Sequence, residues 1–251
     1  MKNDNSNTPL KRGRPPKKDY DPEALMRELI DTAAEIYQEK REIKATALEL
    51  GLPPGKVKKL LITGNVLSYP ETKQIQDLMR QGKTMVEIQH IMGLSYSALH
   101  TYLPYSKVIY KMSEISQNAE RVKAYKARKS AVDTLMAAPT DGHLWDCIVA
   151  FQNYPFHTVS GLPFSYTLKK GRNGEYTKEL FIDRRENSKS LAWSSVRMVF
   201  ERALEQQGTV FTRPKEFADV RGVSYTFSLL WRFGMISVPE EVEKKLKGNR
   251  K

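Results

Sequence analysis

Two stretches of this sequence match each other at a constant offset of 42 residues, and this repeat limits how the first half of the chain can fold. The first stretch is TALELGLPPGKVKKLL and the second is EIQHIMGLSYSALHTYL. The matched positions are Gly51 with Gly93, Leu52 with Leu94, Val57 with Leu99 and Leu61 with Leu103. Since matched glycines and apolar residues serve the same local geometry, the repeat predicts two small units of one kind, at 21–68 and 69–106.

Both units have the pattern of short helices joined by a tight turn. Asp21 and Pro22 are typical of a helix start, and an apolar stripe follows at four-residue spacing. In the second unit, Gly93 offers the positive φ that a tight turn needs, and Ser95 is placed to cap the helix after it. Leu99 and Leu103 are one helical turn apart and are expected to anchor that helix.

The second unit resembles the helix-turn-helix of sigma-factor region four and of many bacterial response regulators. The resemblance lies in Glu87-Ile88, in Met92-Gly93-Leu94-Ser95, and in Leu99, Tyr102 and Leu103. It implies a recognition helix that enters the DNA major groove. The side chains expected there are Ser95, Tyr96, Ser97, His100 and Thr101. Gln89 departs from the small residue usual where the two helices cross, and Ala98 replaces a common Thr.

The first unit has a small residue, Ala47, at the crossing position, and Pro53 in place of the capping Ser. Its second helix is rich in lysine, which favours phosphates over base edges. The expected phosphate contacts are Lys56, Lys58, Lys59 and, beyond the second unit, Lys107. We therefore interpret the first unit as gripping the DNA backbone and the second as reading sequence. The alternative is that one or both units are ordinary helical hairpins.

Residues 1–20 are expected to be a disordered basic arm. Residues 1–18 hold six positive side chains against one Asp. The segment KRGRPPKK resembles an AT-hook, a motif that lies in the minor groove of A·T-rich DNA. The resemblance implies minor-groove contacts from Arg12, Gly13, Arg14, Pro15, Lys17 and Lys18. A solvated charged tail is the alternative.

Residues 107–138 are predicted to be a basic helical linker, with a helix starting near Ser116 or Asn118. Its basic side could continue along the phosphates, or could be a solvated face. Residues 139–240 differ in kind, because they are aromatic and β-rich. Gly171-Arg172-Asn173-Gly174 predicts a β-hairpin in which Asn173-Gly174 supplies the positive-φ turn.

Within 139–240, Ser190 is expected to cap a helix, and a last helix is expected near 224–233. Residues 241–251 are expected to be a charged tail. The fold class predicted for the whole chain is a mostly α N-terminal half, with tandem helix-turn-helix units, and a small α+β C-terminal module that contains a β-hairpin. The basic residues Lys169, Lys170, Arg172, Arg184 and Arg185 either contact DNA or form a solvated hairpin tip.

Several classes of protein are disfavoured. The chain has one cysteine and four histidines, so no familiar zinc spacing is present, and neither a metal nor another cofactor is expected. No apolar run reaches the roughly 20 residues of a membrane span, and the first residues do not resemble a signal peptide. Asp183 and Glu186 lack the further residues of a nuclease motif, so catalysis is not expected.

The formal net charge of +12 points to an anionic partner. From about residue 21 the chain resembles uncharacterised regulator-like proteins of Gram-positive bacteria that are often linked to mobile elements. This implies a cytoplasmic, nucleoid-associated protein that binds double-stranded DNA sequence-specifically, with a homodimer left open. The alternatives are an architectural DNA-bending protein, an accessory factor of recombination or replication on a mobile element, and, least favoured, a nuclease.

Overall fold

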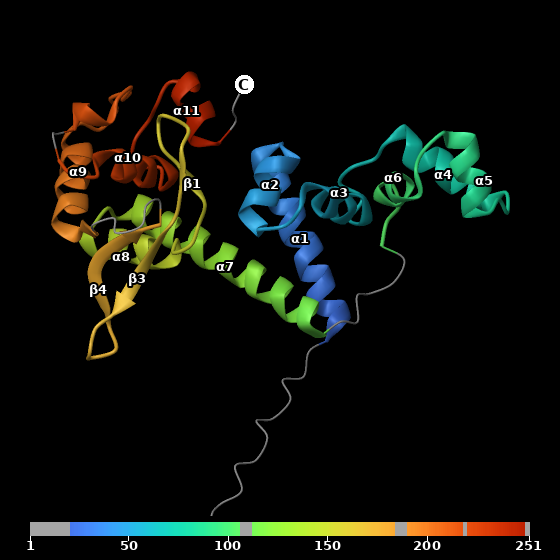
Figure 1. Cartoon of the computed structure of the whole chain (residues 1–251), viewed down its shortest axis with the longest axis horizontal. Helices are drawn as coiled ribbons and strands as arrows, with labels where there is room; N and C mark the ends of the chain where they lie inside the picture. The colour runs from blue at the N-terminus through green and yellow to red at the C-terminus, as the bar shows by residue number, and fades with distance from the viewer. Residues whose placement is uncertain (1–20, 106–111, 184–189, 218–219, 249–251) are drawn as a thin grey trace, which may run out of the picture.

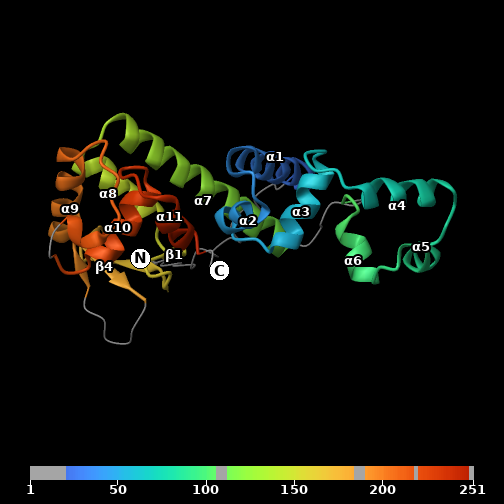
Figure 2. The same cartoon turned by 90° about the horizontal axis from the view of Figure 1, so that it is seen from above.

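The computed structural model describes residues 21–105, 112–183, 190–217 and 220–248. This part of the chain holds eleven α-helices, and its strands all lie in the C-terminal part (Figure 1). The predicted fold class is therefore confirmed at this level, a mostly α N-terminal half followed by a small α+β module. Figures 1 and 2 show three units in a row, with the second repeat unit at one end and the C-terminal module at the other.

The first unit consists of α1 (Pro22–Lys40), α2 (Ile43–Leu50) and α3 (Pro54–Thr63). The Asp21 carboxylate caps α1 by accepting from the backbone N–H groups of Glu23 (2.9 Å) and Ala24 (3.2 Å), as the sequence predicts. The three helices bury one apolar cluster, because each turns its apolar stripe inward. Its fully buried members include Leu29, Ala33, Ile36, Val57, Leu60 and Leu61.

The second unit repeats this arrangement with α4 (Pro70–Arg80), α5 (Met85–Met92) and α6 (Tyr96–Thr101). Helices α5 and α6 begin 42 residues after α2 and α3, so the offset in the sequence is also an offset in structure. The two turns match as well, since Gly51 and Gly93 have φ values of 60° and 62°. Only glycine adopts this conformation without strain. The second core is much smaller, and its fully buried side chains are Ile75, Ile88 and Leu99.

The expected linker is the long helix α7 (Met112–Ala137), which begins before Ser116. Val122 and Tyr125 are buried in the core of the first unit, whereas Leu135 is buried in that of the C-terminal module. Lys126 also pairs with Glu28 of α1, with Nζ to Oε1 at 2.7 Å. Because α7 packs on both units (Figure 2), it is a structural helix that they share, which the sequence did not predict.

The C-terminal module begins with α8 (Asp141–Ala150), followed by two small antiparallel sheets. The first sheet pairs β1 (Phe156–His157) with β2 (Pro163–Phe164). The second has the order β3 (Tyr166–Lys170), β4 (Tyr176–Ile182) and β5 (Leu191–Ala192). Strands β3 and β4 form the predicted hairpin, closed by the Gly171 N–H donating to the Glu175 carbonyl at 2.7 Å. Of the two residues predicted to have positive φ, Gly174 does, with a φ of 82°, whereas Asn173 does not have a positive φ.

The remaining elements are α9 (Trp193–Glu205), the 3₁₀-helix η1 (Pro214–Glu216), α10 (Val223–Arg232) and α11 (Glu240–Leu246). Ser190 does not cap α9, because Ala192 occupies the cap position and the Ser190 hydroxyl hydrogen-bonds to Glu179 instead. Residues 241–251 were expected to be a charged tail, but the structure places a helix, α11, at the start of this segment. Val242 and Leu246 of α11 are buried in the core of the C-terminal module, so the apolar side of this short helix keeps it on the fold.

The module's core surrounds Cys147, which is fully buried. Burial, assisted by the charge of Asp146, raises the pKa of its thiol to about 12, so the sulfur stays protonated and poorly reactive at neutral pH. None of the helices in the described ranges is both long and apolar enough to cross a membrane.

Candidate nucleic-acid interface

The start of α6 presents three polar side chains to solvent. Ser95 caps the helix, with its hydroxyl oxygen accepting from the Ala98 N–H at 3.2 Å. Ser95, Tyr96 and Ser97 are all exposed, and Tyr96 keeps 56% of its surface accessible. An exposed aromatic ring beside two hydroxyls is a surface that can hydrogen-bond and stack, while Leu99 on the opposite side is fully buried.

His100 and Thr101 are less accessible than the sequence suggests, because both are half-buried. The His100 ring packs edge-on against Tyr96, with ring centroids 4.4 Å apart, and its Nε2 atom is buried without a hydrogen-bond partner in the described ranges. The Thr101 hydroxyl donates to the Ala98 carbonyl at 2.7 Å. Of the five residues predicted for the major groove, the structure thus places three on an open face and two at its edge.

Helices α3 and α6 contact each other where the two repeat units meet (Figure 1). The Lys58 ammonium lies over two rings, 3.5 Å from the centroid of Tyr102 and 4.3 Å from that of Tyr69. Cations are attracted to aromatic faces at such distances. The Tyr105 N–H donates to the Thr63 hydroxyl at 3.0 Å, which ties the end of the second unit to α3. Lys58 therefore joins the two units, a role that the sequence does not suggest.

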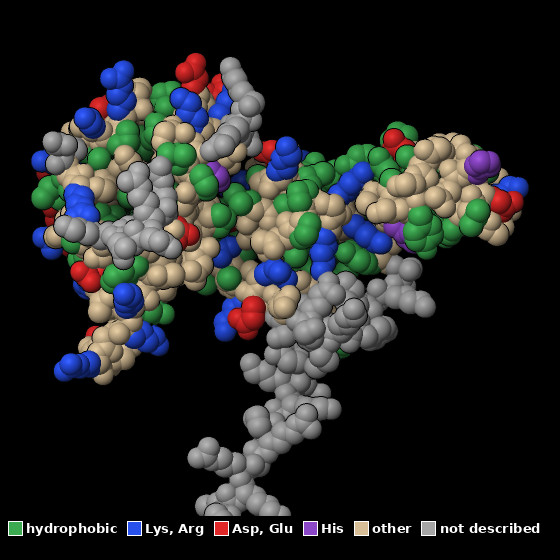
Figure 3. Space-filling view, in the orientation of Figure 1, with side chains coloured by type: hydrophobic (Ala, Val, Ile, Leu, Met, Phe, Trp, Pro, Cys, Tyr) green, Lys and Arg blue, Asp and Glu red, His purple; other side chains and the backbone are tan. Residues whose placement is uncertain are grey.

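The other predicted phosphate contacts differ in their surroundings. Lys59 lies 4.7 Å from the ring centroid of Tyr105, and burial lowers the pKa of its ammonium. Lys56 is half-buried on the same helix. Figure 3 shows Lys and Arg side chains over α3 and its border with α6. Lys107 and the six arm residues between 12 and 18 lie outside the described residues.

A Lys58→Met substitution tests the contact between the units. Because Met keeps the apolar stem and removes the charge, we expect the second unit to lose about 0.5–2 kcal/mol of stability through the lost cation–π contacts. The measurement is a double-mutant cycle with Tyr102→Leu, followed by denaturant unfolding or hydrogen exchange of α4–α6. The exposed Lys73 of α4 supplies the control, since Lys73→Met should change stability little. Additive effects of Lys58→Met and Tyr102→Leu would contradict the assignment.

Basic residues also reach the end of the hairpin, where Lys169, Lys170 and Arg172 are exposed. Figure 3 shows this tip projecting from the module with Lys and Arg at its end. Arg184, Arg185 and Glu186 lie outside the described residues. Asp183 has a structural role, because its two carboxylate oxygens accept hydrogen bonds from the N–H (2.7 Å) and the hydroxyl (2.6 Å) of Ser165.

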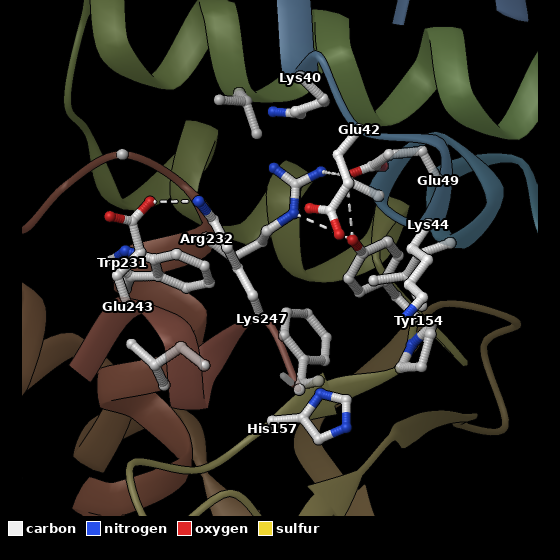
Figure 4. Close-up of a pocket in the computed structure, with 18 of the residues that line it drawn as sticks. Lys40, Glu42, Lys44, Glu49, Tyr154, His157, Trp231, Arg232, Glu243 and Lys247 are labelled. Carbon is white, nitrogen blue, oxygen red and sulfur yellow. Dashed lines mark hydrogen bonds and ion pairs between the residues drawn. The ribbon is translucent and has the colours of Figure 1, made fainter. Parts of the chain in front are cut away.

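A buried ionic cluster that was not predicted from the sequence lies at the junction of the first unit and the C-terminal module. Arg232 of α10 pairs with Glu49 of α2, and the Tyr154 hydroxyl donates to the same Glu49 oxygen at 3.1 Å (Figure 4). Arg232 Nε in turn donates to Tyr154 Oη at 3.2 Å. The available signal was a lone charged residue inside each of two apolar runs, LEL and LLWRF. Such residues are rarely buried without a partner.

Comparisons of this chain with protein-family models, curated proteins and solved structures find no match. A function for this chain is therefore inferred from the residues and geometry described above.

Proposed function

We propose that this chain is a sequence-specific double-stranded DNA-binding protein, and specifically a bacterial transcriptional regulator located with the nucleoid in the cytoplasm. In this proposal each of the pairs α2–α3 and α5–α6 is a helix-turn-helix, and α6 is the helix that reads base edges in the major groove. The N-terminal arm adds contacts in the minor groove. No catalytic activity and no cofactor are part of the proposal, and a homodimer is compatible with it.

The observation that supports this proposal most directly is the start of α6. A positive-φ Gly93 turns the chain between α5 and α6, and the first turn of α6 then exposes Ser95, Tyr96 and Ser97. The first residues of a recognition helix are those that contact base edges in known helix-turn-helix complexes. The net charge of +12 supports an anionic partner in general and is compatible with this face.

The structure suggests one change to the division of work between the units. Lys58 and Lys59 lie over tyrosine rings, so their ammonium groups are shared between packing and any phosphate contact. We therefore assign α3 a double role, in which it holds α6 in place and adds positive charge beside it. Lys56 and Lys107 remain proposed phosphate contacts.

Substitutions on α6 test the proposal. Ser97→Ala and Tyr96→Ala should keep the fold and weaken binding to the preferred site by about 1–3 kcal/mol, because each removes a contact to a base. Preference at the contacted position should relax. The measurement is selection of bound fragments from random DNA, followed by titration of the preferred site. Gln74→Ala, on an exposed position of α4, is the control. Unchanged sequence preference in both α6 variants would count against α6 as the reading helix.

Substitutions in the arm should affect DNA binding in a different way from those on α6. A variant with Arg12→Ala and Arg14→Ala should bind DNA more weakly and flatten the salt dependence, lowering the log–log slope by about 1–2 because fewer counterions are released. The preferred core sequence should stay the same. Titrations over a salt series measure both quantities. A slope and affinity equal to those of the unmodified protein would remove the arm from the proposal.

An architectural DNA-bending protein is the second candidate, supported by the same basic arm. The fragment selection separates the two, because an architectural binder returns A·T-rich DNA without a defined core sequence. Defined half-sites about one helical turn apart would also indicate binding as a homodimer. An accessory role on a mobile element would share the DNA contacts described above and differ in its partner proteins.

A further inference from the structure

Two adjoining cavities lie between the first unit and the C-terminal module. The larger has a volume of about 570 Å³ and is lined from α2, β1, α10 and α11, among others. The smaller has a volume of about 400 Å³ and is lined mainly from α7, with residues of α1, α2 and α10. Five residues line both, which makes them neighbouring chambers of one site: Lys40, Glu49, Val132, Met136 and Arg232. Figure 4 shows Arg232 pointing from α10 toward Glu49 and Tyr154 in the larger chamber.

Three buried polar atoms that belong to residues lining the smaller chamber have no hydrogen-bond partner within the described parts of the chain. They are Glu49 Oε2, Arg128 Nε and the hydroxyl oxygen of Tyr125. The Glu49 side chain is only 6% exposed, and its other oxygen already accepts hydrogen bonds from Arg232 and Tyr154. A buried polar atom without a partner costs free energy, so three at one cavity require an explanation.

The three atoms are complementary in chemistry. Glu49 Oε2 accepts a hydrogen bond, Arg128 Nε donates one, and the Tyr125 hydroxyl can do either. Arg128 also carries a positive charge. Its Nη2 atom donates a hydrogen bond to the main-chain carbonyl of Glu49 at 2.7 Å. The neighbouring Lys129, by contrast, already pairs with Glu35. The residues that line the chamber therefore include an acceptor with negative charge and a donor with positive charge.

The walls around these atoms combine apolar with charged side chains, and the charged ones in the smaller chamber include Glu39, Lys40 and Asp133. Phe151, Val132 and Met136 line the smaller chamber, and Phe156 and Trp231 line the larger. Small-molecule sites combine apolar side chains with polar groups that fix orientation, and they occur preferentially between domains. Volumes of about 570 and 400 Å³ fall within the usual range for such sites, roughly 300–1,000 Å³.

We propose that this junction binds a small zwitterion with an apolar body, either a free amino acid or a dipeptide. Its ammonium group donates to Glu49 Oε2, and its carboxylate accepts from Arg128 Nε and the Tyr125 hydroxyl. Its apolar side chain extends past Val132 into the larger chamber. Because α2 and α7 line the site together with α10, the ligand contacts the first unit and the C-terminal module at once.

The test uses the full-length chain without DNA, so its result does not depend on the proposed function. Calorimetric titration with each of the twenty amino acids and with leucyl-phenylalanine should identify at least one ligand with saturable binding. For the best ligand, N-acetylation removes the ammonium charge, and the matching amine lacks the carboxylate. Each analogue should bind at least about tenfold more weakly, since each loses a charge-assisted hydrogen bond. These analogues test the site without altering the protein.

Protein variants test the location. Val132→Trp fills the passage between the chambers and Arg128→Lys removes Nε while keeping the charge, so each should weaken binding at least tenfold. Lys123→Ala changes an exposed position on the same helix and should leave binding unchanged. Melting curves establish that each variant is folded. The proposal is overturned if no zwitterion binds. Binding that is insensitive to N-acetylation or to Val132→Trp overturns it equally.

Discussion

Replacing Arg232 with Met should lower the free energy of unfolding by about 3–5 kcal/mol, because it removes one partner of a buried ion pair. The Glu49 side chain is 6% exposed and that of Arg232 is 21% exposed, so little water reaches the carboxylate to replace the lost guanidinium. The Tyr154 hydroxyl, 3.1 Å from Glu49 Oε1, can compensate only in part. Denaturant unfolding followed by tryptophan fluorescence measures the loss, since all three tryptophans lie in the C-terminal module.

Two further variants make this prediction specific. Replacing both partners, Glu49→Leu with Arg232→Met, should be less destabilising than the sum of the single changes, because no unpaired charge is then buried. Arg197→Met removes two ion pairs, with Asp141 and Glu201, in which every side chain is at least 50% exposed, and it should cost less than about 1 kcal/mol. A loss below 1 kcal/mol for Arg232→Met would mean that water reaches Glu49 and that the junction is open.

Features of the fold that depend on neighbouring residues were predictable from the sequence. Asp21 with Pro22 begins a helix, and Gly93 ends one in the left-handed conformation, because capping and positive φ are local requirements. The hairpin was predictable for the same reason. Its turn was only partly right, because the connection between Lys170 and Tyr176 is longer than the two-residue loop that needs positive φ at both Asn173 and Gly174.

Features that depend on distant residues were not predictable. Glu49 and Arg232 are 183 positions apart, and no local pattern relates an acid in α2 to a base in α10. The packing of α7 on two units was not predicted, because its buried apolar residues do not form one continuous stripe. Val122 and Tyr125 serve one core, whereas Leu135 serves another, and basic residues separate them. A sequence with one continuous stripe predicts a packed helix more clearly than this one does.

In the candidate interface, too, local features were predictable from the sequence and contacts between distant residues were not. The exposure of Tyr96 and Ser97 follows from the helical position of Leu99, so periodicity predicts it. Lys58 also lies on an amphipathic helix, and periodicity places it away from Val57. The sequence could not show that Tyr69 and Tyr102 of the neighbouring unit cover it. The lysine-rich helix predicted a DNA contact for Lys58, which stays a prediction, but gave no sign of the contact with aromatic rings that the structure shows.

Leu99→Ala should lower the stability of the second unit by about 2–5 kcal/mol, because it removes one of only three fully buried apolar side chains in that core. Leu99, Ile75 and Ile88 are each 0% exposed, and the few half-buried residues around them have little capacity to fill the cavity. A unit this small has little stability to lose. Since the first unit and the C-terminal module have their own cores, we expect α4–α6 to unfold locally while the rest of the chain stays folded.

Hydrogen exchange read along the chain distinguishes this local unfolding from global loss. In Leu99→Ala, backbone amides of α5 and α6 should lose most of their protection, whereas those of α1 and α7 should keep it. Val86→Ala is the control in the same unit, because Val86 is 73% exposed and its loss should change stability by less than about 0.5 kcal/mol. Leu103→Ala should fall between the two, since Leu103 is half-buried. Equal protection in Leu99→Ala and Val86→Ala would mean that contact with α3, and not its own core, stabilises the second unit.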